Sequence, residues 1–252
     1  MITLDQARTK PSLCQEYLDS LDLGDLRSRT RSIIYGDVPG TLYDADGEPD
    51  ENGLAVTLYP HSGSEPGMKP CIRVFSKFFD GKCIKNVDDA LSALGDHERA
   101  HVLQYEDKTQ LDIKLMSYAV DRAEEYFRLN AMKRMATQNL YKEITFKTAQ
   151  DIIEARSEIP AYQVQVDGFE RRRVSEVFRK NAVINLFVRR ELVTMIDDVT
   201  DGAASAMTPD NVVPCLRKID AVQDMQGIME RYMDRMVEMT RGNGYNARRT
   251  VD

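Results

Sequence analysis

The feature that most constrains this chain is the segment His97–His101, HERAH, which matches the pattern H-E-x-x-H. The pattern predicts a helix, because there residues four apart project from one face, one turn apart. Two neutral imidazoles placed in this way can hold one Zn²⁺, and Glu98 can reach a water bound to that metal. The chain has only 3 histidines, and two of them lie here. The alternative interpretation is an ordinary solvated helix face.

Composition places the chain among folded proteins, with 42% apolar and 30% charged residues. The net charge of −7 argues against a general nucleic-acid binder, which usually carries a basic excess. No apolar run approaches the ~18 residues of a membrane span, and the amino-terminal residues lack a secretory pattern. The 4 cysteines are scattered, which indicates reduced thiols. We therefore expect a cytoplasmic or virion-associated protein with neither nucleic acid nor membrane as a partner.

Short strands are predicted before the motif. Arg31–Tyr35, Gly53–Tyr59 and Cys71–Phe79 are rich in β-branched and aromatic residues and are bounded by Gly and Pro. Asn86 is the expected cap of a helix that runs directly into His97. A small sheet followed by a helix with H-E-x-x-H is the order that a metallopeptidase needs.

The second half of the chain is predicted to be mostly helical. Gln110–Leu140 has apolar residues at three- and four-residue steps and no Gly or Pro. A second stretch, Thr148–Ile196, is expected to break at Glu158–Pro160 and at Gly168. Because proline suits only the first turn of a helix, Ser157 is the expected cap of a new helix.

A Gly/Ala/Pro-containing linker, Gly202–Pro214, precedes a methionine-rich amphipathic helix, Ile219–Thr240, which Gly242 is expected to stop. The methionines predict a core face or a seam for a protein partner. The fold class that follows is α+β: a small mixed β-sheet, an H-E-x-x-H helix and a mostly helical carboxy-terminal half. The expected domains are 1–200 (strands about 31–79, helices 86–196) and 201–252 (linker, methionine-rich helix and tail).

A catalytic zinc usually has three protein ligands, so the two histidines need a partner. Asp107 stands where a longer form of the motif places its third ligand, but Gln104 replaces the glycine that permits the turn. The preferred third ligand is Glu158. The alternatives that stay open are His61, Asp107, Asp121, Glu124 and Glu125.

Glu158–Gln165, EIPAYQVQ, follows the pattern E-x-x-A-[YF]-x-x-Q. An H-E-x-x-H helix followed by such a glutamate resembles the zincin-type metallopeptidases of the gluzincin kind, and the resemblance covers roughly Gly53–Arg173. It implies Zn²⁺ held by both histidines and Glu158. It also implies that Ala161 lets the two helices approach closely, and that Tyr162 packs near the site.

The resemblance implies hydrolysis of peptide bonds through a zinc-bound water, with Glu98 as general base. Tyr162, His61 and Tyr105 are the candidates for the donor to the oxyanion. An extended peptide or protein substrate is expected to add to the edge strand Gly53–Tyr59. The alternative function is a non-catalytic structural or assembly protein, in which the metal site is vestigial or structural and the methionine-rich helix binds a protein partner.

Overall fold

The computed structural model describes residues 2–36, 53–60, 64–111 and 136–246. Its α+β fold combines a small three-stranded mixed sheet with helices that dominate the carboxy-terminal half. The chain divides into two compact units: Met1–Lys108 with Pro160–Asn185, and Thr109–Ile159 with Leu186–Asp252. The expected division into domains 1–200 and 201–252 stays a prediction.

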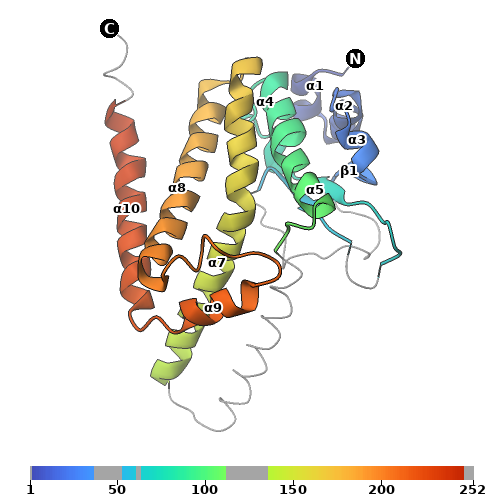
Figure 1. Ribbon diagram of the computed structural model, residues 1–252. Coiled ribbons are helices and arrows are strands. Elements are labelled where there is room, and N and C mark those ends of the chain that lie inside the picture. Colours follow the sequence, from blue (N-terminus) through green and yellow to red (C-terminus); the bar gives the residue numbers. More distant parts are fainter. Residues whose placement is uncertain (1, 37–52, 61–63, 112–135, 247–252) are drawn as a thin grey trace. The chain divides into compact units, whose positions relative to one another are not determined.

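The first unit begins with short helices, drawn in blue in Figure 1. Their bounds are α1 (Leu4–Thr9), the 3₁₀ turn η1 (Pro11–Leu13), α2 (Cys14–Ser20) and α3 (Leu26–Arg29). Thr3 caps α1 through a capping box with Gln6, in which each side chain satisfies a backbone N–H at the other residue. Tyr17 and Leu18 of α2 are buried in the core of the unit.

The sheet contains β1 (Ser32–Tyr35), β2 (Ala55–Leu58) and β3 (Cys71–Val74) in the order β1-β3-β2. β1 runs parallel to β3, and β2 runs antiparallel to it. The three expected strands are therefore confirmed, with one correction. After Val74 the chain forms the 3₁₀ turn η2 (Ser76–Phe79) instead of continuing as a strand, because this turn buries two consecutive phenylalanines.

Three helical segments follow one another without a break and carry the H-E-x-x-H motif. They are α4 (Val87–Leu91), the π-helix η3 (Ser92–Glu98) and α5 (Arg99–Glu106). The side chain of Asn86 accepts a hydrogen bond from the backbone N–H of Asp89 at 2.9 Å, as expected for an N-cap. η3 contacts β2, so the sheet supports the motif.

Helix α7 (Ala136–Asp167) corrects the expected break at Glu158–Pro160, because it runs through Pro160 without ending. Ser157 therefore lies inside the helix and does not cap a new one. An interior proline costs about 3 kcal/mol in helix stability. Ala155 before the exposed Pro160 and Ala161 directly after it are both buried, and such packing is the kind of contribution that offsets a local helix cost. The break at Gly168 is confirmed, since α7 ends at Asp167.

After α7 the chain forms the 3₁₀ turn η4 (Gly168–Arg171) and then α8 (Glu176–Thr200). The connecting residues lie against α4. The backbone N–H of Ser175 donates to the buried carboxylate of Asp89 at 2.7 Å, and Asn86 donates to the carbonyl of Arg173 at 3.2 Å. These bonds fix the start of α8 within the first unit.

The second unit consists of helical segments, of which the described parts are most of α7, α8 from Leu186, α9 (Val212–Asp220) and α10 (Met225–Asn246). In Figure 1, α8 and α10 lie side by side, and Tyr232 of α10 donates a hydrogen bond to the carbonyl of Val188 at 3.4 Å. The core of this unit is formed by Ile152, Ile153, Leu192, Ile196, Leu216, Ile219, Met225 and Ile228.

The methionine-rich helix begins and ends at other residues than the sequence predicted. Ile219 belongs to α9, and α10 begins at Met225 and continues past Gly242 to Asn246. A glycine inside a helix costs only about 1 kcal/mol, which is too little by itself to end one. The segment expected as a linker buries Ala203, Ala204 and Met207. In the part of the chain that the structure describes, no helix has the length and apolarity needed to cross a membrane.

Candidate metal centre

The H-E-x-x-H motif straddles the junction of η3 and α5, with His97 and Glu98 in the last turn of the π-helix and His101 in the first turn of α5. π-Helical turns are rare and frequently occur at functional sites. The centroids of the two imidazole rings lie 5.0 Å apart, with the ring planes at 80°. Both rings therefore project from the same side of the helical run, as the spacing predicts.

A hydrogen bond orients the second imidazole. Nδ1 of His101 lies 3.1 Å from the amide Oε1 of Gln104, on the next turn of α5. An Nδ1–H that donates to this oxygen leaves Nε2 with its lone pair, which is the tautomer that binds a metal through Nε2. Gln104 thus orients a candidate ligand, although the sequence singled it out only because it is not a glycine.

The carboxylate of Glu98 is buried and held by the sheet. Thr57 on β2 donates from its hydroxyl to Oε2 of Glu98 at 2.7 Å, and both residues are buried. Burial of a carboxylate is favourable only when hydrogen bonds replace its lost water. The contact therefore gives the expected base a defined position beside the two histidines.

Glu158 is the residue that meets the two histidines. One ligand atom each from His97, His101 and Glu158 lies within 4.8 Å of the others. Glu158 is carried by α7, which continues uninterrupted into Pro160–Asp167 of the first unit. It therefore lies on the same helix as Tyr162, one turn earlier.

Tyr162 packs directly on the first histidine. The centroids of the Tyr162 and His97 rings lie 4.4 Å apart, with the planes at 60°. Ala161 is fully buried, and its implied role in the close approach of the two helices stays a prediction. The structure thus brings Tyr162 to the site. Its expected contact with the oxyanion of a substrate stays a prediction.

An arginine of the second unit accompanies Glu158. Nε of Arg189 on α8 lies 3.9 Å from Oε2 of Glu158, and its Nη2 donates to Glu154 at 3.2 Å. The side chains of Glu158 and Arg189 are about equally accessible, at 20% and 19%. The positive charge of Arg189 therefore lies beside the carboxylate of Glu158.

Of the other candidate ligands, one is absent from the cluster around the two histidines, and the rest lie outside the described residues. Asp107 is the exposed C-cap of α5 and is absent from the cluster. His61, Asp121, Glu124 and Glu125 fall in ranges that the structure does not describe. Of the described His, Cys, Asp and Glu residues, those that gather as a candidate metal site are His97, His101 and Glu158.

Two arginine–aspartate pairs fix the motif helix from outside. Arg99 donates to Asp25 at 2.7 and 3.0 Å, and these bonds, followed by one from Arg29, hold the pKa of Asp25 well below its usual range. Arg172 donates to Asp96 at 2.8 and 3.0 Å, and the bonds to Asp96 raise the pKa of Arg172. Sequence reasoning missed both pairs, because their members are more than seventy residues apart.

The donor set fits Zn²⁺. Two imidazole nitrogens and one carboxylate oxygen are the ligands of a common class of catalytic zinc site, which leaves a fourth position for water or substrate. Neutral imidazoles and an ionised carboxylate are the forms in which such side chains bind a metal. The set is less suited to Ca²⁺ or Mg²⁺, which prefer oxygen ligands.

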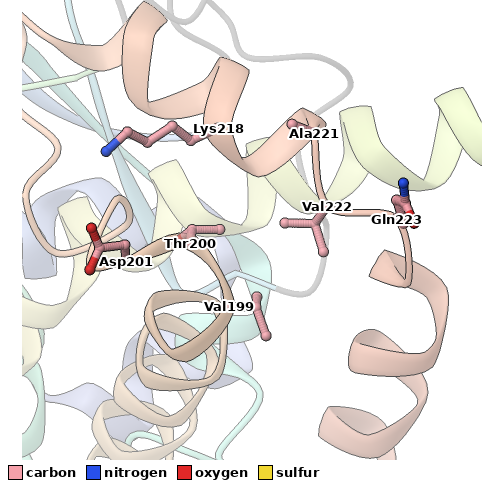
Figure 2. A pocket seen from close by; sticks show the side chains of 7 residues that line it. All are labelled: Val199, Thr200, Asp201, Lys218, Ala221, Val222 and Gln223. Carbon is pink, nitrogen blue, oxygen red and sulfur yellow. The ribbon is translucent and has the colours of Figure 1, made fainter.

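The hollow drawn in Figure 2 is a separate feature of the second unit. It lies where α8 ends and where α9 leads into α10, and Asp201 and Lys218 are among the side chains around it. Its lining contains no residue of the candidate metal centre. It therefore contributes nothing to the arrangement described above.

Comparison with known proteins found no family model, no curated protein and no solved structure that matches this chain. The resemblance to gluzincins therefore rests on the motif residues themselves.

Proposed function

We propose that this chain is a zinc-dependent peptidase, in which His97, His101 and Glu158 hold the metal and Glu98 is the general base. The observation that carries the proposal is the convergence of these three donors within 4.8 Å, from two helices far apart in the sequence. The motif alone has a false-positive risk. Glu158 belongs to a second sequence pattern, independent of the first, and it lies beside the two histidines. This agreement strengthens the assignment.

Zinc bound at this centre supplies Lewis acidity, which polarises a peptide carbonyl and lowers the pKa of water toward ~7. Glu98 takes a proton from the attacking water as its oxygen bonds to the carbonyl carbon. Glu98 then passes this proton to the amide nitrogen as the C–N bond breaks, so the products are a carboxylic acid and an amine. The hydroxyl of Thr57 holds the carboxylate in place for both transfers.

The substrate proposed is an extended peptide. Within the described residues β2 pairs with β3 and forms an edge of the sheet. A peptide added to this edge gains backbone hydrogen bonds independently of its sequence. Because Thr57 of β2 contacts Glu98, a peptide bound there passes close to the proposed base.

The test combines metal content with peptide cleavage. The full chain is purified, its zinc is measured by inductively coupled plasma mass spectrometry, and cleavage of a mixed peptide library is followed by mass spectrometry. The wild type is expected to carry one zinc per chain and to cleave peptides. His97→Ala is expected to lose the zinc. Glu98→Gln is expected to keep it while cleavage falls by about 10²–10⁴-fold.

The matched control is Glu170→Gln, the same substitution at an exposed residue of η4. It is expected to retain both zinc and activity. A wild-type protein without zinc, and without metal-dependent cleavage, overturns the proposal. Zinc that is retained together with cleavage that is unaffected by Glu98→Gln removes Glu98 from its role.

A second candidate function, an assembly protein, is favoured by one observation in the second unit. Met233 and Val237, one turn apart on α10, are 56% and 38% exposed, and Phe187 of α8 is 51% exposed. Large apolar side chains that are exposed in one contiguous patch indicate a protein partner, and Met233 and Val237 are one turn apart on α10. Self-association that is abolished by Met233→Glu, in a protein that binds no zinc, would favour this function over the peptidase.

A further inference from the structure

The bidentate pair of Asp96 and Arg172 joins the motif helix to the end of the ligand-bearing helix α7. Asp96 lies in η3 directly before His97, and Arg172 directly follows η4, which begins where α7 ends. Nε and Nη2 of Arg172 donate to the two carboxylate oxygens at 2.8 and 3.0 Å. Such paired bonds fix direction as well as distance.

The pair is shielded from water, with side-chain exposures of 10% for Asp96 and 25% for Arg172. Transferring two charged groups out of water costs free energy, and this cost offsets much of the attraction between them. A shielded ion pair is therefore weak evidence for a net gain in stability. The pair therefore matters for the geometry that it imposes on η3 and on the turn η4, which it joins.

Gly168, the first residue of η4, allows this geometry. A Cβ atom at this position would lie 2.9 Å from Oδ2 and 3.3 Å from Cγ of Asp96. Because Arg172 holds the carboxylate by both oxygens, Asp96 has little freedom to move aside. The backbone at the end of α7 therefore touches the carboxylate at a distance that only glycine permits.

These contacts give α7 two points of attachment to η3. One is the pair of rings His97 and Tyr162, and the other is Gly168 against Asp96, six residues further along the chain. Two points of attachment fix both the rotation of a helix about its axis and its position along that axis, whereas one point leaves the helix free to rotate. Glu158 lies one turn before Tyr162, so both attachments define where its carboxylate stands.

We propose that Asp96 and Arg172 are positioning residues of the metal centre, and that with Gly168 they set the register between the histidine-bearing helix and the glutamate-bearing helix. The inference rests on the proposed zinc site. It assigns to these three residues an effect on metal affinity, which acts through the placement of Glu158 relative to His97.

The experiment measures zinc affinity by competition with a chromophoric chelator, and global stability by urea unfolding of the same variants without metal. Asp96→Asn and Arg172→Lys are each expected to weaken zinc binding by about 10- to 100-fold, the range seen when residues that orient metal ligands are changed. Lysine keeps the charge of Arg172 but cannot form the two parallel bonds. The visible absorption of the Co²⁺-loaded variants is expected to change with the altered ligand geometry.

The matched control is Asp25→Asn, which breaks another bidentate pair, with Arg99, on the same helical run. That pair joins α5 to the residue before α3 and does not involve α7. The control is expected to lower stability while leaving zinc affinity within twofold of the wild type. It separates a loss of register from a general loss of stability.

Gly168→Ala supplies an independent variant. It is expected to weaken zinc binding in the wild-type background and to have a smaller effect in an Asp96→Ala background, where the atoms that the new methyl group meets are gone. The inference is overturned if Asp96→Asn and Arg172→Lys bind zinc as tightly as Asp25→Asn does. A wild type that binds no zinc overturns it together with the proposed function. If zinc is bound but no peptide is cleaved, only the enzymatic proposal fails, and the affinities still decide the inference.

Discussion

The hydroxyl of Thr57 donates to Oε2 of Glu98 at 2.7 Å, so a strand and the motif helix share one buried hydrogen bond. The two residues are 41 positions apart in the chain. Thr57 faces Ile72 across the sheet, and its side chain points to the helical run. Glu98, the proposed base, thus has a hydrogen-bond donor that belongs to neither sequence motif.

Replacing Thr57 by valine removes this donor and keeps the branched shape. The free energy of unfolding is expected to fall by about 1–3 kcal/mol, because the buried carboxylate loses a partner that water cannot replace. Thr57→Ser retains the hydroxyl and is expected to lose less. Urea unfolding followed by circular dichroism measures both. Equal stability of the valine variant and the wild type would show that the bond contributes nothing.

Gln104 provides a test of how His101 is oriented. Gln104→Leu removes the acceptor at Nδ1 and with it one restraint on the ring, and zinc affinity is expected to weaken by about tenfold. Gln104→Glu offers a stronger acceptor and is expected to bind zinc at least as tightly as the wild type. Chelator competition measures both variants. Tighter binding by the leucine variant would argue against this role for Gln104.

Tyr17 makes stability depend on pH in the alkaline range. Burial raises the pKa of Tyr17 to about 12, against a smaller opposing effect of the Arg8 charge. In the unfolded chain the phenol ionises near pH 10, so the unfolded state loses this proton first. Stability is therefore expected to fall by about 1.4 kcal/mol per pH unit between pH 10 and 12.

Comparison with Tyr17→Phe isolates this effect, because the other tyrosines and the cysteines are common to both proteins. The phenylalanine variant lacks this component of the alkaline loss. Among the described residues, the Tyr17 hydroxyl has no hydrogen-bond partner. The variant is therefore expected to be more stable by about 1 kcal/mol at neutral pH. Parallel slopes for the two proteins from pH 10 to 12 would refute the assignment.

Local features of this chain were predictable because they depend on neighbours in sequence. The cap at Asn86, the three strands and the helical placement of His97 and His101 all follow from short-range patterns, and the structure has them. Glu158 was preferred over five other residues on the strength of a second motif. It is the one that lies beside the two histidines within the described residues.

What could not be predicted depends on packing between distant segments. Pro160 indicated a helix start by local rules, yet α7 passes through it, with the buried Ala155 before the proline and the buried Ala161 directly after it. The contacts of Asp96 with Arg172 and Gly168 join residues more than seventy positions apart. No periodicity in the sequence marks such a pair.

The π-helical turn of η3 has a consequence for how the centre tolerates insertions and deletions. Each residue that widens a helical turn rotates everything after it by about 100° relative to what came before. Deleting one of residues 92–96, the part of η3 that precedes His97, would return the run to α-helical spacing. Glu98 would then swing away from Thr57, and the imidazoles away from α7, with every side chain of the motif unchanged. In this protein the candidate centre depends on the number of residues before the motif as much as on the residues in it.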